Sequence, residues 1–133
     1  MRPEWRPNDM SDLLAIPILL SPDIEATTDF ARSCGFDVES FGDYAILRGH
    51  GIELHYAHTT RPDVCAHTSC YIRGGGILAL HETLRSLGAR RLSDIASRPW
   101  GMTEFYLHDP HDNLLKFGMS TDELPAGHSF PEG

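Results

Sequence analysis

The stretch that decides the fold is RPWGMTEFYLHDPHDNLLKFG, residues 98–118. Residues 103–107 are rich in β-branched and aromatic side chains, which favour an extended strand. Asp109-Pro110 then opens a turn, because proline has a preset φ, and Asn113 tolerates the left-handed conformation that closes it. Residues 114–117 are expected to form the returning strand. The stretch therefore predicts a loop followed by a β-hairpin.

The residues before this hairpin show one pattern twice. In the first half, Ser21 is predicted to cap a helix that has Pro22 at its first position and ends at Gly35. In the second half, a helix with apolar residues three and four positions apart ends at Gly88. The predicted elements are a strand at 14–20, a helix at 22–33, strands at 36–41, 44–48 and 52–57, a strand at 67–73, a helix at 76–87, a strand at 89–95 and the hairpin at 103–117. The chain is therefore predicted to be α+β, with two tandem β-α-β-β-β modules.

The duplication defines the expected domain organisation. Residues 13–119 are predicted to form a single domain, with modules at about 13–58 and 66–118, since 133 residues bury one proper core. Residues 1–12 are polar and are expected to be an N-terminal arm. Residues 120–133 are rich in Gly and Pro and are expected to be a flexible tail.

Composition excludes several classes of partner. The formal net charge is −8, with 19 acidic against 11 basic residues, and no Lys/Arg cluster indicates a nucleic-acid surface. The longest apolar run, residues 13–20, contains Pro17 and is far shorter than the roughly 20 residues that span a bilayer. Three cysteines without a CxxC pair are typical of reduced thiols. We expect a cytoplasmic protein with neither nucleic-acid nor membrane partners.

Alternation along the predicted strands sorts polar side chains onto one face of each sheet. Glu53 and His55 share a face opposite Leu54 and Tyr56. By the same rule His67, Ser69 and Tyr71 lie together, and so do Glu104, Tyr106, His108 and Lys116. A face with this composition indicates a ligand pocket. The alternative is a solvated sheet face, which is common in antiparallel sheets.

The quoted stretch and four shorter ones resemble one known family. An aromatic Pro-Trp-Gly precedes a strand with Glu104-Phe105, followed by Asp-Pro, two residues, Asn and a short apolar strand. Further matches lie at residues 15–19, 29–30, 34–36 and 73–74. Together these motifs resemble the bleomycin resistance proteins of the glyoxalase/vicinal-oxygen-chelate superfamily. The resemblance implies an arm-exchanged homodimer in which the chain crosses to its partner near Pro17, with clefts between the subunits.

The resemblance also implies what the clefts do. Relatives of this kind sequester a bleomycin-type antibiotic without turnover, so we expect antibiotic binding and resistance with a cationic aromatic ligand. The expected ligand-binding residues are Trp100, Tyr71, Tyr106, Ser69, Glu53, Glu104 and His55, with Phe41 and Tyr44 at the rim. Aromatic rings would stack on the ligand and carboxylates would pair with its amines.

Metal-dependent enzymes of the superfamily offer the main alternative. Their four ligand positions correspond here to Ile16, Glu53, His67 and Lys116. Ile16 has no donor atom and Lys116 would bring a positive charge to the ion, so no metal, cofactor or catalytic residue is expected; Glu53 and His67 are the weak metal candidates. A metal-dependent glyoxalase or dioxygenase and a binder of another small molecule stay open as alternatives.

Overall fold

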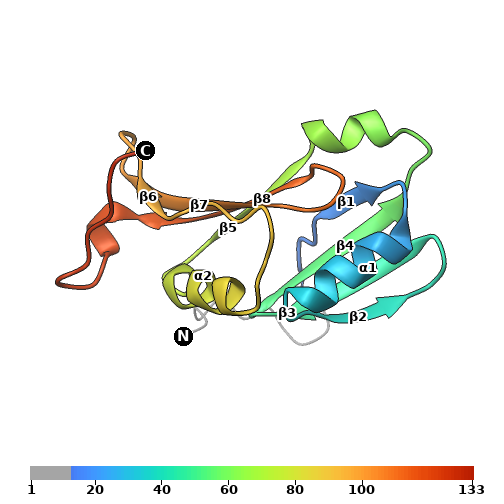
Figure 1. The fold of residues 1–133 in the computed structure, drawn as a ribbon, viewed down its shortest axis with the longest axis horizontal. Helices are drawn as coiled ribbons and strands as arrows, with labels where there is room; N and C mark the ends of the chain where they lie inside the picture. Colours follow the sequence, from blue (N-terminus) through green and yellow to red (C-terminus); the bar gives the residue numbers. More distant parts are fainter. Residues whose placement is uncertain (1–12) are drawn as a thin grey trace.

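The computed structural model describes residues 13–133; the predicted arm, residues 1–12, lies outside the described residues. The elements follow the predicted order (Figure 1). They are β1 (Ile18–Ser21), α1 (Ile24–Ser33), β2 (Asp37–Ser40), β3 (Tyr44–Gly49), β4 (Ile52–His58), the 3₁₀-helix η1 (Pro62–His67), β5 (Ser69–Arg73), α2 (Ile77–Ser86), β6 (Ala96–Ser97), β7 (Met102–His108), β8 (Leu114–Ser120) and the 3₁₀-helix η2 (Thr121–Glu123).

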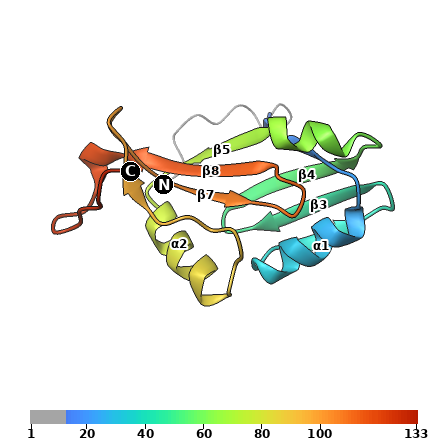
Figure 2. The same ribbon diagram turned by 45° about the horizontal axis from the view of Figure 1, so that its top comes forward.

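The two halves have the same topology, which confirms the predicted duplication. Sheet A has the strand order β1-β4-β3-β2, and sheet B has the order β5-β8-β7-β6. In each sheet the first strand pairs in parallel with the last strand of its module, and the other pairs are antiparallel. Figures 1 and 2 show α1 and α2 along the same side of the two sheets, so the opposite side carries neither helix. We call this opposite side the open face of each sheet.

Strand alternation gives each sheet one apolar face against its helix. In sheet A, Leu47, Leu54 and Tyr56 are buried. In sheet B, Phe105 stacks on Phe117 with ring centroids 4.6 Å apart. Side chains from both halves form one contiguous core, as the predicted alternation requires.

A buried polar cluster joins the halves at the turn of the β7–β8 hairpin. Asp109 and Asn113 are both fully buried. The Asp109 carboxylate accepts hydrogen bonds from Tyr56 Oη of β4 and from Asn113 Nδ2, each at 2.8 Å. Asn113 Nδ2 also donates to the Leu20 carbonyl of β1 at 2.8 Å, and Thr68 Oγ1 donates to Asn113 Oδ1. The second hairpin is thereby bonded to two strands of the first module.

This cluster corrects the predicted turn conformation. The left-handed residue is Asp112, with φ 79°, and not Asn113. Asp112 N–H donates to the Asp109 carbonyl at 3.1 Å, which closes the turn one residue earlier than expected. Asn113 thus lies immediately before the returning strand, where its amide reaches across the module boundary.

The start of the first strand and the cap of the first helix also differ from the prediction. The strand begins at Ile18 and not at residue 14, because regular pairing with β4 starts there. The helix cap is Asp23 and not Ser21: the Asp23 side chain accepts from Ala26 N–H at 3.2 Å. Ser21 is instead buried, and its hydroxyl accepts from Thr27 Oγ1 at 2.7 Å.

Two strands of the second half differ from their predicted ranges. The predicted strand at 89–95 is a loop with a single bridge between Leu92 and Leu107, and β6 covers only Ala96–Ser97. Arg91 has φ 57°, a left-handed conformation that interrupts an extended strand. The predicted strand at 67–73 starts at Ser69, because His67 ends η1. His67 therefore does not share a strand face with Ser69 and Tyr71.

The segment predicted to be a flexible tail returns to sheet B after η2. Ser97 N–H donates to the Pro131 carbonyl at 2.9 Å, and Gly133 N–H donates to the Ser97 carbonyl at 3.3 Å. The mobility of this segment stays a prediction. Among residues 13–133, neither α-helix has the length and apolar composition needed to cross a bilayer.

The polar cluster predicts a large stability loss for Tyr56→Phe. This variant removes one donor from the buried Asp109 carboxylate, and a buried acceptor left short of a partner costs about 1–3 kcal/mol. We expect the free energy of unfolding, measured with urea, to fall by that amount. Tyr44→Phe is the matched control, because it removes the same atom from a partly exposed hydrogen bond to His55 and should cost less. Equal losses in the two variants would contradict this role for the cluster.

Candidate functional site

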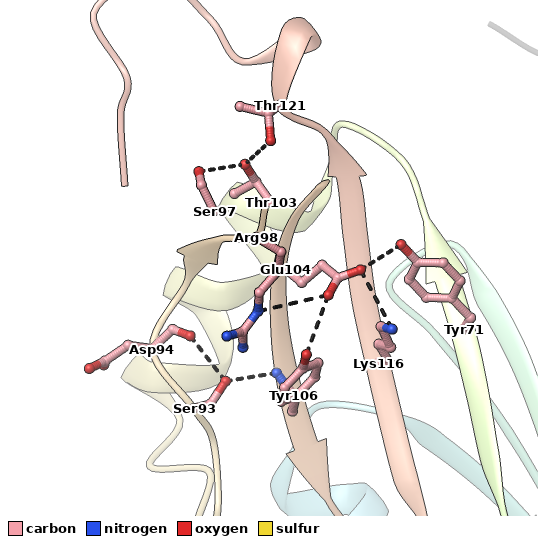
Figure 3. Close-up of polar contacts among 10 residues, drawn as sticks. All are labelled: Tyr71, Ser93, Asp94, Ser97, Arg98, Thr103, Glu104, Tyr106, Lys116 and Thr121. Carbon is pink, nitrogen blue, oxygen red and sulfur yellow. Dashed lines mark hydrogen bonds and ion pairs between the residues drawn. The ribbon is translucent and has the colours of Figure 1, made fainter. Parts of the chain in front are cut away.

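The open face of sheet B is organised around a buried glutamate. Glu104 of β7 is only 1% exposed. Its carboxylate accepts hydrogen bonds from Tyr71 Oη of β5 at 2.9 Å and from Tyr106 Oη at 3.3 Å. Figure 3 shows both phenol groups directed at the carboxylate, one toward each of its oxygens. Glu104 therefore orients two of the aromatic side chains that the sequence singled out.

Two cations flank the same carboxylate. Lys116 Nζ lies 3.6 Å from Glu104 Oε2, and Arg98 Nε lies 3.9 Å from Glu104 Oε1 (Figure 3). A buried carboxylate without such partners would be strongly unfavourable. The Arg98 guanidinium also lies over the Tyr106 ring at 5.1 Å, and Lys116 Nζ lies 4.9 Å from the Tyr71 ring centroid. The negative charge of Glu104 is thus balanced within the protein.

Gly118, which has no side chain, leaves room for the Tyr71 ring to reach Glu104. Strand β8 runs between β5 and β7, so the Tyr71 ring must cross β8 to reach the carboxylate. It crosses at Gly118, where an added Cβ would lie 3.0 Å from Tyr71 Cε1 and closer still to Tyr71 Oη. Burial and then the hydrogen bond to Glu104 raise the pKa of Tyr71, which keeps its hydroxyl protonated as a donor. Any larger residue at position 118 would displace this ring.

The open face of sheet A holds a second polar group. Tyr44 Oη lies 2.7 Å from His55 Nδ1, and His55 Nε2 lies 2.6 Å from Glu53 Oε2. Arg48 bonds Glu53 at 3.2 Å and Glu39 at 2.7 Å. The His55 hydrogen bond, followed by that of Arg48, lowers the pKa of Glu53. Each ring nitrogen of His55 therefore has a hydrogen-bond partner.

Glu53 also lines a hollow of about 360 Å³ together with Ile16 and Arg48. Two of the four positions that correspond to superfamily metal ligands, Ile16 and Glu53, therefore lie together. His67 is exposed at the end of η1, and Lys116 lies beside Glu104 on the other sheet. Within residues 13–133, no group of three or more His, Cys, Asp or Glu side chains is arranged to hold a metal ion.

The seven predicted ligand-binding residues fall into two groups and two single positions. Tyr71, Tyr106 and Glu104 are together on sheet B, while Glu53 and His55 are bonded on sheet A. Trp100 stands apart in the turn before β7, where its side chain is 60% exposed, and Ser69 is exposed at the start of β5. Whether these residues bind a ligand stays a prediction.

Sequence reasoning missed two residues that shape the site. Gly118 fits the alternating strand pattern. Its missing side chain indicates that another group packs against the backbone only once the neighbouring strand, β5, is known. Arg98 lies in a loop before Pro99, where no periodicity assigns it a face. Tyr106 and Lys116 lie beside Glu104, and the structure adds the burial of Glu104 and the nearby Arg98.

The arrangement is that of the glyoxalase/bleomycin resistance fold, which confirms the resemblance at the level of fold. A bleomycin-binding protein complexed with bleomycin has a TM-score of 0.73 at 23% identity, over 82% of this chain and 99% of that one. A bleomycin-binding protein from Streptomyces verticillus, complexed with copper(II)-bleomycin, has a TM-score of 0.68 at 28% identity, over 80% and 95%. A glyoxalase-related enzyme from Clostridium phytofermentans has a TM-score of 0.64 at 19% identity, over 86% and 99%. No protein-family model and no curated protein sequence matches the chain.

The crossing at Gly118 predicts a specific defect in Gly118→Ala. The new methyl group should push Tyr71 away from Glu104, so that the phenol loses burial and its hydrogen bond. We expect the pKa of Tyr71, followed by NMR, to fall toward its ordinary value, with a stability loss of about 1–3 kcal/mol from overpacking. Ser120→Ala, which changes a partly exposed position of β8, should leave the Tyr71 titration unchanged. An unaltered Tyr71 titration in Gly118→Ala would contradict the proposed crossing.

Proposed function

We propose that this protein sequesters a bleomycin-type aromatic antibiotic without altering it chemically. The observation that carries the proposal is the pair of open sheet faces, each with ordered polar and aromatic side chains, in a fold that bleomycin-binding proteins share. The ordered tyrosines Tyr71 and Tyr106 and the exposed Trp100 supply flat surfaces on which aromatic rings stack. Three free cysteines are compatible with a reducing cytoplasm, where we place this activity.

The binding clefts are proposed to form between two copies of the chain. Each open face is a single wall, and the two faces differ in charge. Sheet A presents Glu39 and Glu53 against Arg48, whereas sheet B presents more cations than carboxylates. Sheet A of one copy placed opposite sheet B of the other would pair an acidic wall with a basic one. A cationic group of the antibiotic would face Glu53, and its rings would face Tyr71 and Tyr106.

Exposed apolar residues before β1 support the same assembly. Leu13 and Leu14 are 76% and 75% exposed, and Ile18 on β1 is 57% exposed. Apolar side chains that cluster in this way on a surface usually mark an interface. We propose that this segment, next to Pro17, packs on the partner subunit as the arm of an exchanged dimer.

The dimer is tested by sedimentation at several protein concentrations. The chain should sediment at twice the mass of one copy, and Leu14→Glu should shift it toward monomer because a charge in an apolar interface is unfavourable. Leu87→Glu alters an apolar residue that is 48% exposed at the end of α2 and should leave the dimer intact. A wild-type monomer at high micromolar concentration would refute the shared cleft.

Antibiotic binding is tested by calorimetric titration with metal-free and copper(II)-loaded bleomycin. We expect micromolar affinity or better, which corresponds to about −8 kcal/mol. Trp100→Ala should weaken binding roughly three- to tenfold, since one stacked ring contributes about 0.5–1.5 kcal/mol beyond burial. Leu87→Ala, at the end of α2, is the control and should bind normally. A folded dimer that binds neither form, and that gives expressing cells no protection, would overturn the proposal.

A further inference from the structure

Three cationic side chains gather on the open face of sheet B in a protein whose overall charge is strongly negative. The Arg73 guanidinium lies 5.6 Å from the Tyr71 ring centroid, and Lys116 Nζ lies 4.9 Å from the same ring. The Arg98 guanidinium lies 5.1 Å from the centroid of the Tyr106 ring. Each tyrosine ring of the site is therefore flanked by positive charge, held there by cation–π attraction.

Glu104, the carboxylate among these cations, accepts no hydrogen bond from them. Glu104 already accepts hydrogen bonds from both tyrosine hydroxyls. Its distances to Lys116 Nζ and Arg98 Nε, 3.6 and 3.9 Å, are longer than N–H···O hydrogen bonds. Within residues 13–133, Arg98 Nε is buried and has no hydrogen-bond partner. Among the described residues, Glu104 is therefore an ion-pair partner of both cations but accepts no hydrogen bond from either.

The charged groups on this face differ in their exposure. The backbone of Gly133 packs against the guanidinium, since an added Cβ there would lie 2.8 Å from Arg98 Nη1. Among the described residues, Glu104 supplies the ion pairs of both Arg98 and Lys116, and Arg73 has none. Glu104 is 1% exposed, whereas Arg73 is exposed and the Lys116 side chain is 31% exposed. Figure 3 shows the Glu104 carboxylate between Arg98, Lys116 and the two phenol groups. A ligand on this face therefore meets cations before it meets the carboxylate.

We infer that the open face of sheet B, at Arg73, Arg98 and Lys116, is a subsite for an anionic group carried by an aromatic ligand. The group is a carboxylate, sulfonate, sulfate or phosphate, which accepts from guanidinium and ammonium donors. Its ring lies beside Tyr71 and Tyr106. The inference rests on the ligand-binding function proposed above. It adds that the ligand carries an anionic group as well as a cationic one: the acidic open face of sheet A binds the cation, and the open face of sheet B binds the anion. The overall negative charge does not prevent this, because screening confines charge effects to about 8 Å at physiological salt.

The test uses two probes that share a ring system and differ in charge. Naphthalene-2-sulfonate and 2-(aminomethyl)naphthalene are titrated into the full chain by calorimetry at about 50 mM and about 500 mM NaCl, where screening differs strongly. We expect the sulfonate to bind about tenfold more tightly than the amine at low salt and to lose most of this advantage at high salt. Inorganic sulfate should compete with the sulfonate but bind more weakly, which separates recognition of the anion from stacking of the ring.

Single-charge variants locate the subsite. Lys116→Gln should weaken sulfonate binding about five- to tenfold at low salt and leave amine binding unchanged or stronger. Arg73→Gln, at an exposed position, gives the same readout should Lys116→Gln disturb folding. Arg90→Gln is the matched control: it removes one charge from an exposed arginine beside α1 and should keep sulfonate affinity within about twofold.

Parallel titration with bleomycin separates this inference from the proposed function. Bleomycin binding without any preference for the sulfonate overturns the anion subsite and leaves sequestration standing. Sulfonate binding that depends on Lys116, without bleomycin binding, supports the subsite and overturns the antibiotic as ligand. Binding of neither overturns both. Equal sulfonate losses in Lys116→Gln and Arg90→Gln would also overturn the subsite, because they would show only a general charge effect.

Discussion

The packing of the two modules depends on the hydrogen bonds that the buried Asp109 carboxylate accepts. A charge taken out of water must be hydrogen-bonded from several sides, and Asp109 accepts from Tyr56, from the Asn113 side chain and from the backbone N–H groups of His111 and Asn113. Tyr56 belongs to the first module and the other donors to the second. These hydrogen bonds therefore join the two modules to each other. The pKa of Tyr56 is raised by burial and then by Asp109, so the phenol stays a donor.

The position of the modules determines what the open faces can do. Because α1 and α2 lie on the same side, the two faces that carry polar residues are both on the opposite side, and within residues 13–133 neither α-helix covers them. Within residues 13–133, each open face is one surface that a second copy can cover. The proposed assembly of two copies supplies the missing wall for each, and the opposite charge of the walls gives a physical reason for their pairing.

Glu53 and Glu104 show how the same residue type takes different roles in the two modules. Glu53 is partly exposed, and hydrogen bonds from His55 and Arg48 lower its pKa, so it can still meet a ligand. Glu104 is buried, and its role is to orient Tyr71 and Tyr106. The same residue type on the corresponding face thus serves as a surface charge in one module and as an internal support in the other.

The sequence by itself determined the duplication, the order of the elements, the hairpin at residues 103–117 and the faces on which Glu53, His55 and Glu104 lie. These features depend on local periodicity and turn chemistry, which operate within a few residues. Tertiary structure alone decided the left-handed turn residue, the short β6, the role of Arg98 and the burial of Glu104. Those outcomes depend on groups far apart in the chain: Asn113 reaches the Leu20 carbonyl, and Tyr71 passes over Gly118 to reach Glu104. Local patterns specify which side of a strand a residue occupies, but only the packed sheets specify what lies across from it.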